Sequence, residues 1–77
     1  MSDKVREILK EVEEFRVDTL EAAESFRLKF LSKKGKVTGV FSEMRNIAPE
    51  HRKAFGQLFN ELKNKAETKW KEALAGL

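Results

Sequence analysis

A helical repeat of apolar residues fills the last part of the chain, after its single proline, Pro49. The residues that recur there, at an average spacing of 3.6, are Phe55, Phe59, Leu62, Ala66, Trp70 and Ala73. Because proline is favoured in the first turn of a helix, the repeat predicts one helix over about residues 49–74. At a rise of 1.5 Å per residue this helix is roughly 40 Å long, more than a compact bundle of this size spans. It must therefore pair lengthwise with other helices, as one side of an antiparallel hairpin.

The preceding residues supply the partners of that long helix. Apolar residues at steps of three and four predict three shorter helices, over about residues 2–15, 19–32 and 36–45. Asp18 with Glu21 has the spacing of a capping box, which predicts the start of the second. Gly35 would end it in a left-handed conformation, although the second and third helices could also be one helix kinked there. We expect an all-α hairpin or coiled coil with the short first helix packed on it.

The composition limits the chain to one small domain, residues 1–77. It contains no cysteine, and its one histidine, His51, cannot build a metal site alone. No apolar run is long enough for a membrane span, and the start of the chain does not have the pattern of a signal peptide. We therefore expect a soluble, cytoplasmic domain without a metal ion and without membrane contact.

No group of residues predicts catalysis. Cysteine and tyrosine are absent, and no serine has a nearby histidine and acid in a recognisable pattern, which nearly excludes a free-standing enzyme. The aromatic side chains that fall on the apolar stripes are expected in the core. They are Phe26, Phe30, Phe41, Phe55, Phe59 and Trp70. Only Phe30 lies close enough to the lysines for base stacking to be the alternative.

Positive charge gathers in the middle of the chain. Residues 1–24 hold eight acids and four bases, whereas residues 25–47 hold six bases and one acid. Five of those bases lie in the stretch 27–38, on both sides of Gly35. A bend that concentrates cations suits contact with a polyanion such as nucleic acid, although an arbitrary lysine cluster is as often a solvated loop.

Three blocks follow one another in the chain: residues 26–38 (FRLKFLSKKGKVT), 48–52 (APEHR) and 56–63 (GQLFNELK). In this order they resemble the N-terminal region of the bacterial phenylalanyl-tRNA synthetase alpha subunit. The Lys-Lys-Gly turn alone is a weak signal, but the three blocks at this spacing are specific, and the match covers the chain from about residue 16. The departures remove no basic residue of the motif: Ser32 stands where the family usually has glycine, Phe30 where tyrosine is common and His51 where an acid is frequent.

The resemblance implies a helical arm that projects from the catalytic body of an (αβ)₂ heterotetramer and contacts tRNA(Phe). The ATP, Mg²⁺ and phenylalanine sites would lie further along a longer alpha chain. This piece would then be non-catalytic, hold no cofactor and be mostly monomeric alone.

Basic residues in the matching blocks and beside them are the candidates for phosphate contact, and the lysines at 33, 34 and 36 are the strongest. The candidates are Arg27, Lys29, Lys33, Lys34, Lys36, Arg45, Arg52 and Lys53. The rival hypothesis is a protein-interaction coiled coil without RNA contact. Salt separates the two, because phosphate contacts weaken steeply with salt and an apolar helix seam does not.

Overall fold

The part of the chain that the structure describes folds into helices only. The computed structural model describes residues 2–77, and no strand occurs among them, so the predicted all-α class is confirmed. The elements are α1 (Ser2–Glu14), α2 (Leu20–Phe26) continued by a π-helical turn η1 (Arg27–Leu31), α3 (Lys36–Glu43) continued by a 3₁₀ turn η2 (Met44–Asn46), and α4 (Pro49–Gly76). The long helix begins at the proline, as the repeat predicts.

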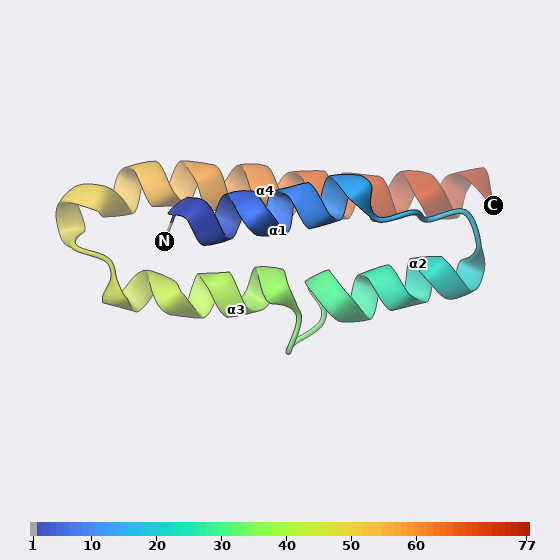
Figure 1. Ribbon diagram of the computed structural model, residues 1–77, viewed down its shortest axis with the longest axis horizontal. Helices are drawn as coiled ribbons and strands as arrows, with labels where there is room; N and C mark the ends of the chain where they lie inside the picture. Colours follow the sequence, from blue (N-terminus) through green and yellow to red (C-terminus); the bar gives the residue numbers. More distant parts are fainter. Residues whose placement is uncertain (1) are drawn as a thin grey trace.

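The helix α4 runs along the whole length of the molecule, and the other helices lie beside it (Figure 1). α1 runs in the same direction as α4, while α2 and α3 follow one another in the opposite direction and form the second side of the hairpin. The molecule measures 43 × 19 × 16 Å, and the 28 residues of α4 account for about 42 Å of this length. The long C-terminal helix therefore sets the shape of the whole bundle.

The core lies where α1, α4 and the α2–α3 side meet. Its buried residues are Val5, Ile8, Val12, Phe26, Phe30, Val37, Val40, Ile47, Phe55, Phe59, Leu62 and Ala66. The rings of Phe15, Phe26 and Phe30 pack against one another, with centroids 4.8 to 5.9 Å apart. Because Leu62 is fully buried, shortening it to alanine costs about 2–5 kcal/mol.

Two aromatic residues expected in the core are not fully buried: Trp70 is partly buried, and Phe41 is exposed. Phe41 is 58% exposed, although it lies on the apolar stripe of α3. Its ring contacts that of Phe59, with centroids 5.4 Å apart, but no other helix covers the rest of it. The prediction for Phe41 was therefore wrong, because the bundle closes over the stripe from one side only.

The start of α2 also differs from the prediction. Thr19 is the N-cap, and its Oγ1 accepts a hydrogen bond from the backbone N–H of Ala22 at 3.0 Å. Asp18 lies outside the helix, 4.0 Å from Arg16. The capping box placed at Asp18 was therefore wrong by one residue.

The end of α1 is held against α4 by lysines. Lys69 donates hydrogen bonds to the backbone carbonyls of Val12 and Glu13, at 2.6 and 2.9 Å. These carbonyls belong to the last turn of α1, where a cation is favourable. Lys65 donates to the Glu13 carboxylate at 3.3 Å, and this hydrogen bond raises the pKa of Lys65. The acidic first helix is thus fixed on the bundle at its C-terminal end.

Candidate nucleic-acid interface

The bend between η1 and α3 is ordered by four hydrogen bonds that involve Ser32. Its backbone N–H donates to the carbonyl of Arg27 at 2.9 Å, and its hydroxyl donates to the carbonyl of Leu28 at 2.6 Å. Its own carbonyl accepts from the backbone N–H of Gly35 and from the Thr38 hydroxyl, both at 2.8 Å. The first of these bonds closes the π-helical turn. The second and third helices are therefore separate, joined by a defined turn.

Gly35 is needed in this turn because the chain passes very close to η1. Its φ of −72° and ψ of 164° are open to any residue, so the predicted left-handed helix stop was wrong. A Cβ at this position would lie 2.6 Å from both the carbonyl carbon and the carbonyl oxygen of Phe30. Backbone atoms cannot move aside as a side chain can, and the turn therefore requires glycine.

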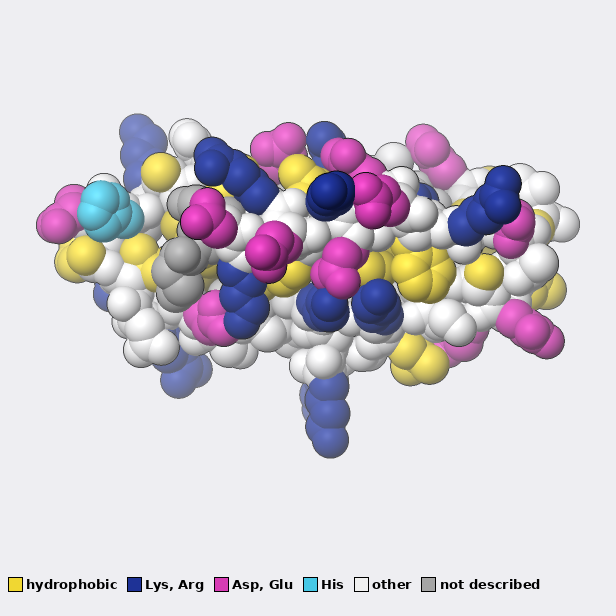
Figure 2. Space-filling model, viewed as in Figure 1, with side chains coloured by type: hydrophobic (Ala, Val, Ile, Leu, Met, Phe, Trp, Pro, Cys, Tyr) yellow, Lys and Arg dark blue, Asp and Glu magenta, His cyan; other side chains and the backbone are white. Residues whose placement is uncertain are grey.

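Lys33 and Lys34 lie on the outer side of this bend, between Ser32 and Gly35. Both are exposed, and Figure 2 shows basic side chains protruding from the body of the molecule at this place. Within residues 2–77 neither ammonium group takes part in an ion pair. Two adjacent cations without an ion-pair partner within residues 2–77, presented by an ordered turn, are well suited to bind phosphate.

Lys36 and Lys29 face α1 instead. The Lys36 ammonium group donates to both carboxylate oxygens of Glu11, at 2.7 and 2.8 Å. Lys29 lies 3.9 Å from the same carboxylate, and it also lies over the rings of Phe15 and Phe30. α1 therefore neutralises part of the cation cluster that appears continuous in the sequence.

Arg27 is paired within its own helical segment. Its guanidinium group donates to both carboxylate oxygens of Glu24, which the three-residue spacing places on the same face. The hydrogen bond holds the pKa of the Glu24 carboxyl below its usual value and raises the pKa of Arg27. A phosphate would have to compete with Glu24 for this side chain.

The other candidates form a second group at the far end of α3, roughly 15 Å of helix away from Lys36. Arg45 lies in η2, and Arg52 and Lys53 lie in the first turns of α4. The Nε of Arg52 donates to the backbone carbonyl of Ile47 at 3.1 Å, which fixes the direction of its side chain. Arg45 and Arg52 line one shallow hollow, while Lys53 is exposed outside it. The eight candidates are thus divided between two places.

The sequence does not reveal that Glu11 takes part in this region by pairing with its lysines. It lies on the short first helix, which was expected to pack on the hairpin, and its lysine partner is 25 residues away. The one available signal is its place beside Val12, whose burial puts Glu11 at the edge of the contact between α1 and α3. Its importance follows from tertiary packing, which local patterns do not contain.

No group of three or more His, Cys, Asp or Glu side chains within residues 2–77 could hold a metal ion. None of the helices described is both long enough and apolar enough to cross a membrane. The single histidine, His51, is exposed near the start of α4.

Residues 18–77 match the family model described as "Aminoacyl tRNA synthetase class II, N-terminal domain". Similar proteins include the phenylalanine–tRNA ligase alpha subunits of Cytophaga hutchinsonii (43% identical over 74 residues, covering 94% of this chain and 22% of that protein) and Bacteroides thetaiotaomicron (42% over 69 residues, 90% and 20%). The alpha subunit of Prosthecochloris aestuarii is 36% identical over 73 residues, covering 95% of this chain and 21% of that protein. No solved structure matches the chain significantly.

The chain spans about a fifth of the length of these curated relatives. The segment matched by the family model contains the bend with its lysines, α3 and all of α4, and the similarity to the relatives extends over most of α1 as well. The chain is thus similar to one segment of phenylalanine–tRNA ligase alpha subunits, and it belongs to the family of class II aminoacyl-tRNA synthetase N-terminal domains.

Proposed function

We propose that this chain is a tRNA-binding arm, which helps to position tRNA(Phe) for aminoacylation. The observation that carries this proposal is the pair Lys33 and Lys34, exposed without an ion-pair partner within residues 2–77 on a bend that hydrogen bonds keep in one shape. The family of the chain makes RNA the natural polyanion. Arg45, Arg52 and Lys53 would provide further phosphate contacts at the other end of α3.

The chemistry of these residues limits what the arm can do. Lysine contacts phosphate as a point charge and carries no information about the base, so binding by the bend should be weak and almost independent of sequence. Each phosphate contact releases counter-ions, which supplies the free energy of association. The ordered bend adds direction, because it holds the two cations at a fixed place on a stiff hairpin.

In this proposal residues 1–77 form a single non-catalytic arm of a longer alpha chain. ATP, Mg²⁺ and phenylalanine would bind elsewhere in that chain, and assembly with a beta subunit into an (αβ)₂ heterotetramer would not involve the bend. The isolated arm would be monomeric, because its apolar stripes pair with one another inside the hairpin.

The first test is binding of the 77-residue chain to a tRNA(Phe) transcript at several salt concentrations, followed by fluorescence anisotropy. Affinity should fall steeply with salt, with a slope in the logarithmic plot of about 0.7 to 0.9 for each phosphate contact. Sedimentation of the chain alone should show a monomer. A chain that ignores tRNA but forms a salt-resistant dimer would instead support the protein-interaction coiled coil.

A second test uses a complete alpha subunit assembled with its beta subunit, from which residues 1–77 have been deleted. Phenylalanine-dependent ATP–pyrophosphate exchange should remain nearly intact, because it does not use tRNA. Aminoacylation should fall sharply, because the binding energy that positions the tRNA is lost. Equal loss of both reactions would mean that the arm holds the enzyme together, and full retention of both would contradict the proposed role.

A further inference from the structure

Phe41 is an exposed aromatic side chain at the junction of α3 and α4, and within residues 2–77 the bundle covers less than half of it. It is 58% exposed, while the ring that it contacts, that of Phe59, is 8% exposed. The two rings are tilted by 44° with centroids 5.4 Å apart, so Phe59 supports one side of Phe41. A supported ring with a free surface is a place where a flat apolar group can stack.

On one side of Phe41 lies a shallow hollow of about 540 Å³ that is lined by cations. Its lining residues are Phe41, Ser42, Met44, Arg45 and Arg52, and no carboxylate is among them. Arg52 is already oriented by its hydrogen bond to the Ile47 carbonyl, which uses Nε and leaves the two terminal nitrogens for another acceptor. Guanidinium groups bind phosphate with a planar, two-pronged geometry. The charge of this hollow therefore favours an anion.

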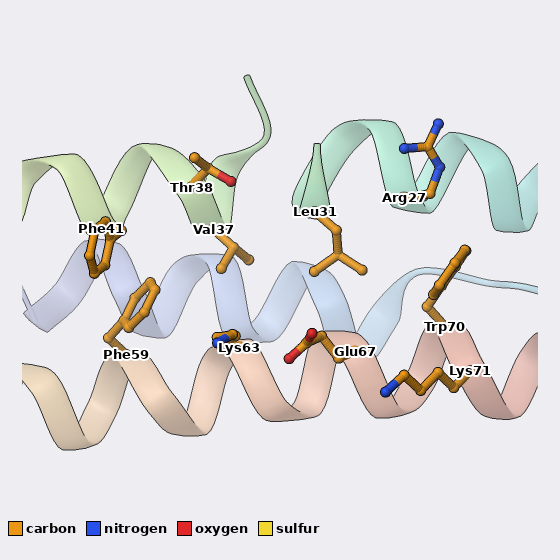
Figure 3. A pocket seen from close by; sticks show the side chains of 10 residues that line it. All are labelled: Arg27, Leu31, Val37, Thr38, Phe41, Phe59, Lys63, Glu67, Trp70 and Lys71. Atoms are coloured by element: carbon orange, nitrogen blue, oxygen red, sulfur yellow. The ribbon is translucent and has the colours of Figure 1, made fainter. Parts of the chain in front are cut away.

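On the other side of Phe41 an apolar groove of about 500 Å³ runs between the α2–α3 side and α4. Figure 3 shows Phe41 and Phe59 at one end of it and Trp70 towards the other, with Leu31 and Val37 between them. The groove passes directly beside the lysine bend, because Leu31 and Val37 are the residues that flank it in the chain. An RNA held by the bend would therefore reach Phe41 along this side of the molecule.

We propose that Phe41 is a stacking platform for one unpaired RNA base, whose phosphate is bound by Arg45 and Arg52. This inference rests on the proposed tRNA-binding function and names the part of the RNA that the arm recognises. A base needs an aromatic or apolar face and a nearby cation, and Phe41 with its two arginines offers both within one surface. An apolar helix of a partner protein would fit the groove, but it would leave the cationic hollow without a counter-ion.

The test compares two substitutions of Phe41 that keep an apolar side chain beside Phe59 but differ in aromatic character. Phe41→Leu keeps an apolar side chain on the helix and removes the ring, whereas Phe41→Trp keeps an aromatic face. Binding of each variant to a tRNA(Phe) transcript and to a blunt RNA duplex without unpaired bases is measured at several salt concentrations, with melting temperatures as the folding control. Leu20→Ala, another exposed apolar residue outside the groove, is the matched control.

Phe41→Leu should lose roughly 5- to 150-fold in affinity for the tRNA, the usual effect of removing one base–aromatic stack. It should bind the duplex as the wild type does, and its salt slope should be unchanged. Phe41→Trp and Leu20→Ala should bind the tRNA normally. Arg45→Gln with Arg52→Gln should weaken tRNA binding and lower the salt slope.

Two results would overturn the platform and can be told apart. Equal tRNA binding by the wild type and Phe41→Leu would remove the platform while leaving the arm as a phosphate binder, and would make a partner helix the better occupant of the groove. A wild-type chain that binds no RNA at all would overturn both this inference and the proposed function.

Discussion

The bend between η1 and α3 carries lysines of two kinds. The outer lysines, Lys33 and Lys34, are exposed and have no ion-pair partner within residues 2–77, although Lys34 also lines a hollow with Glu11 and Lys36. On its inner side, Lys36 and Lys29 lie against α1 and share the carboxylate of Glu11. All four residues lie in one basic stretch of the sequence. The difference between them comes only from the way in which α1 packs.

This comparison shows that a cluster of cations in a sequence is not a measure of its available charge. α1 pairs the inner lysines with Glu11 and leaves the outer ones without an ion-pair partner within residues 2–77. In the proposed function this would direct the polyanion to one face. An exposed ion pair contributes only about 0–1 kcal/mol to stability, and its effect on the binding of an anion is therefore the more important one. The substitutions below break or sharpen this division.

The largest effect is expected from Gly35→Ala, which disturbs the bend that separates the two kinds of lysine. The new Cβ would collide with the Phe30 carbonyl, and we expect a loss of about 1–3 kcal/mol in the free energy of unfolding. Gly39→Ala is the matched control, because a Cβ there meets nothing within 4 Å. That variant should be stabilised by about 0.5–1 kcal/mol through its higher helix propensity. Urea unfolding followed by circular dichroism measures both, and equal behaviour of the two variants would mean that the close approach at Gly35 is unimportant.

A smaller effect, of opposite sign, is expected from Glu11→Gln. Removing this carboxylate frees Lys36 and Lys29, so tRNA binding should become stronger and the salt slope should rise by up to about 1.8, for two added phosphate contacts. Glu14→Gln, the control, removes the same charge from α1. Glu14 lies 4.0 Å from Lys10, whereas Lys29 and Lys36 pair with Glu11. If both variants strengthened binding equally, the effect would be one of net charge and the inner lysines would not be special.

The smallest effect concerns the pair Arg27 and Glu24. Like the inner lysines, Arg27 is paired with a carboxylate of the same chain. The Arg27 hydrogen bond lowers the pKa of Glu24 in the folded chain. The contribution of this ion pair to stability is therefore present above the ordinary glutamate pKa. It is lost as the pH falls through the lowered pKa of Glu24. A carboxyl-carbon NMR titration should give Glu24 a lower midpoint in the wild type than in Arg27→Gln, and coinciding midpoints would show that the pair does not form in solution.

Much of the fold could be predicted from the sequence, because it depends on local periodicity. The apolar stripe after Pro49 predicts α4, and the steps of three and four residues predict where the core side chains lie. The same periodicity also predicted that Phe41 is buried, which was wrong. Periodicity says which residues share a face, but it does not say whether another helix covers that face.

The candidate site depends on features that the sequence does not display. The π-helical turn that ends at Leu31 is closed by a hydrogen bond from the backbone N–H of Ser32 to the carbonyl of Arg27, and no residue pattern marks it. The role of Gly35 follows from its distance to the Phe30 carbonyl, which is set by the path of the turn. The pairing of Glu11 with Lys36 joins residues far apart in the chain. Each of these is a consequence of tertiary geometry.

The most direct test of the account compares two double variants that remove the same charge from the two sides of the bend. Lys33→Gln with Lys34→Gln removes the outer lysines, and Lys29→Gln with Lys36→Gln removes the inner ones. The salt dependence of binding to a tRNA(Phe) transcript is measured for both and for the wild type. The outer double variant should lower the slope by about 1.4 to 1.8, and the inner one should leave it nearly unchanged. Equal losses, or a larger loss for the inner pair, would contradict the division of the bend into free and occupied lysines.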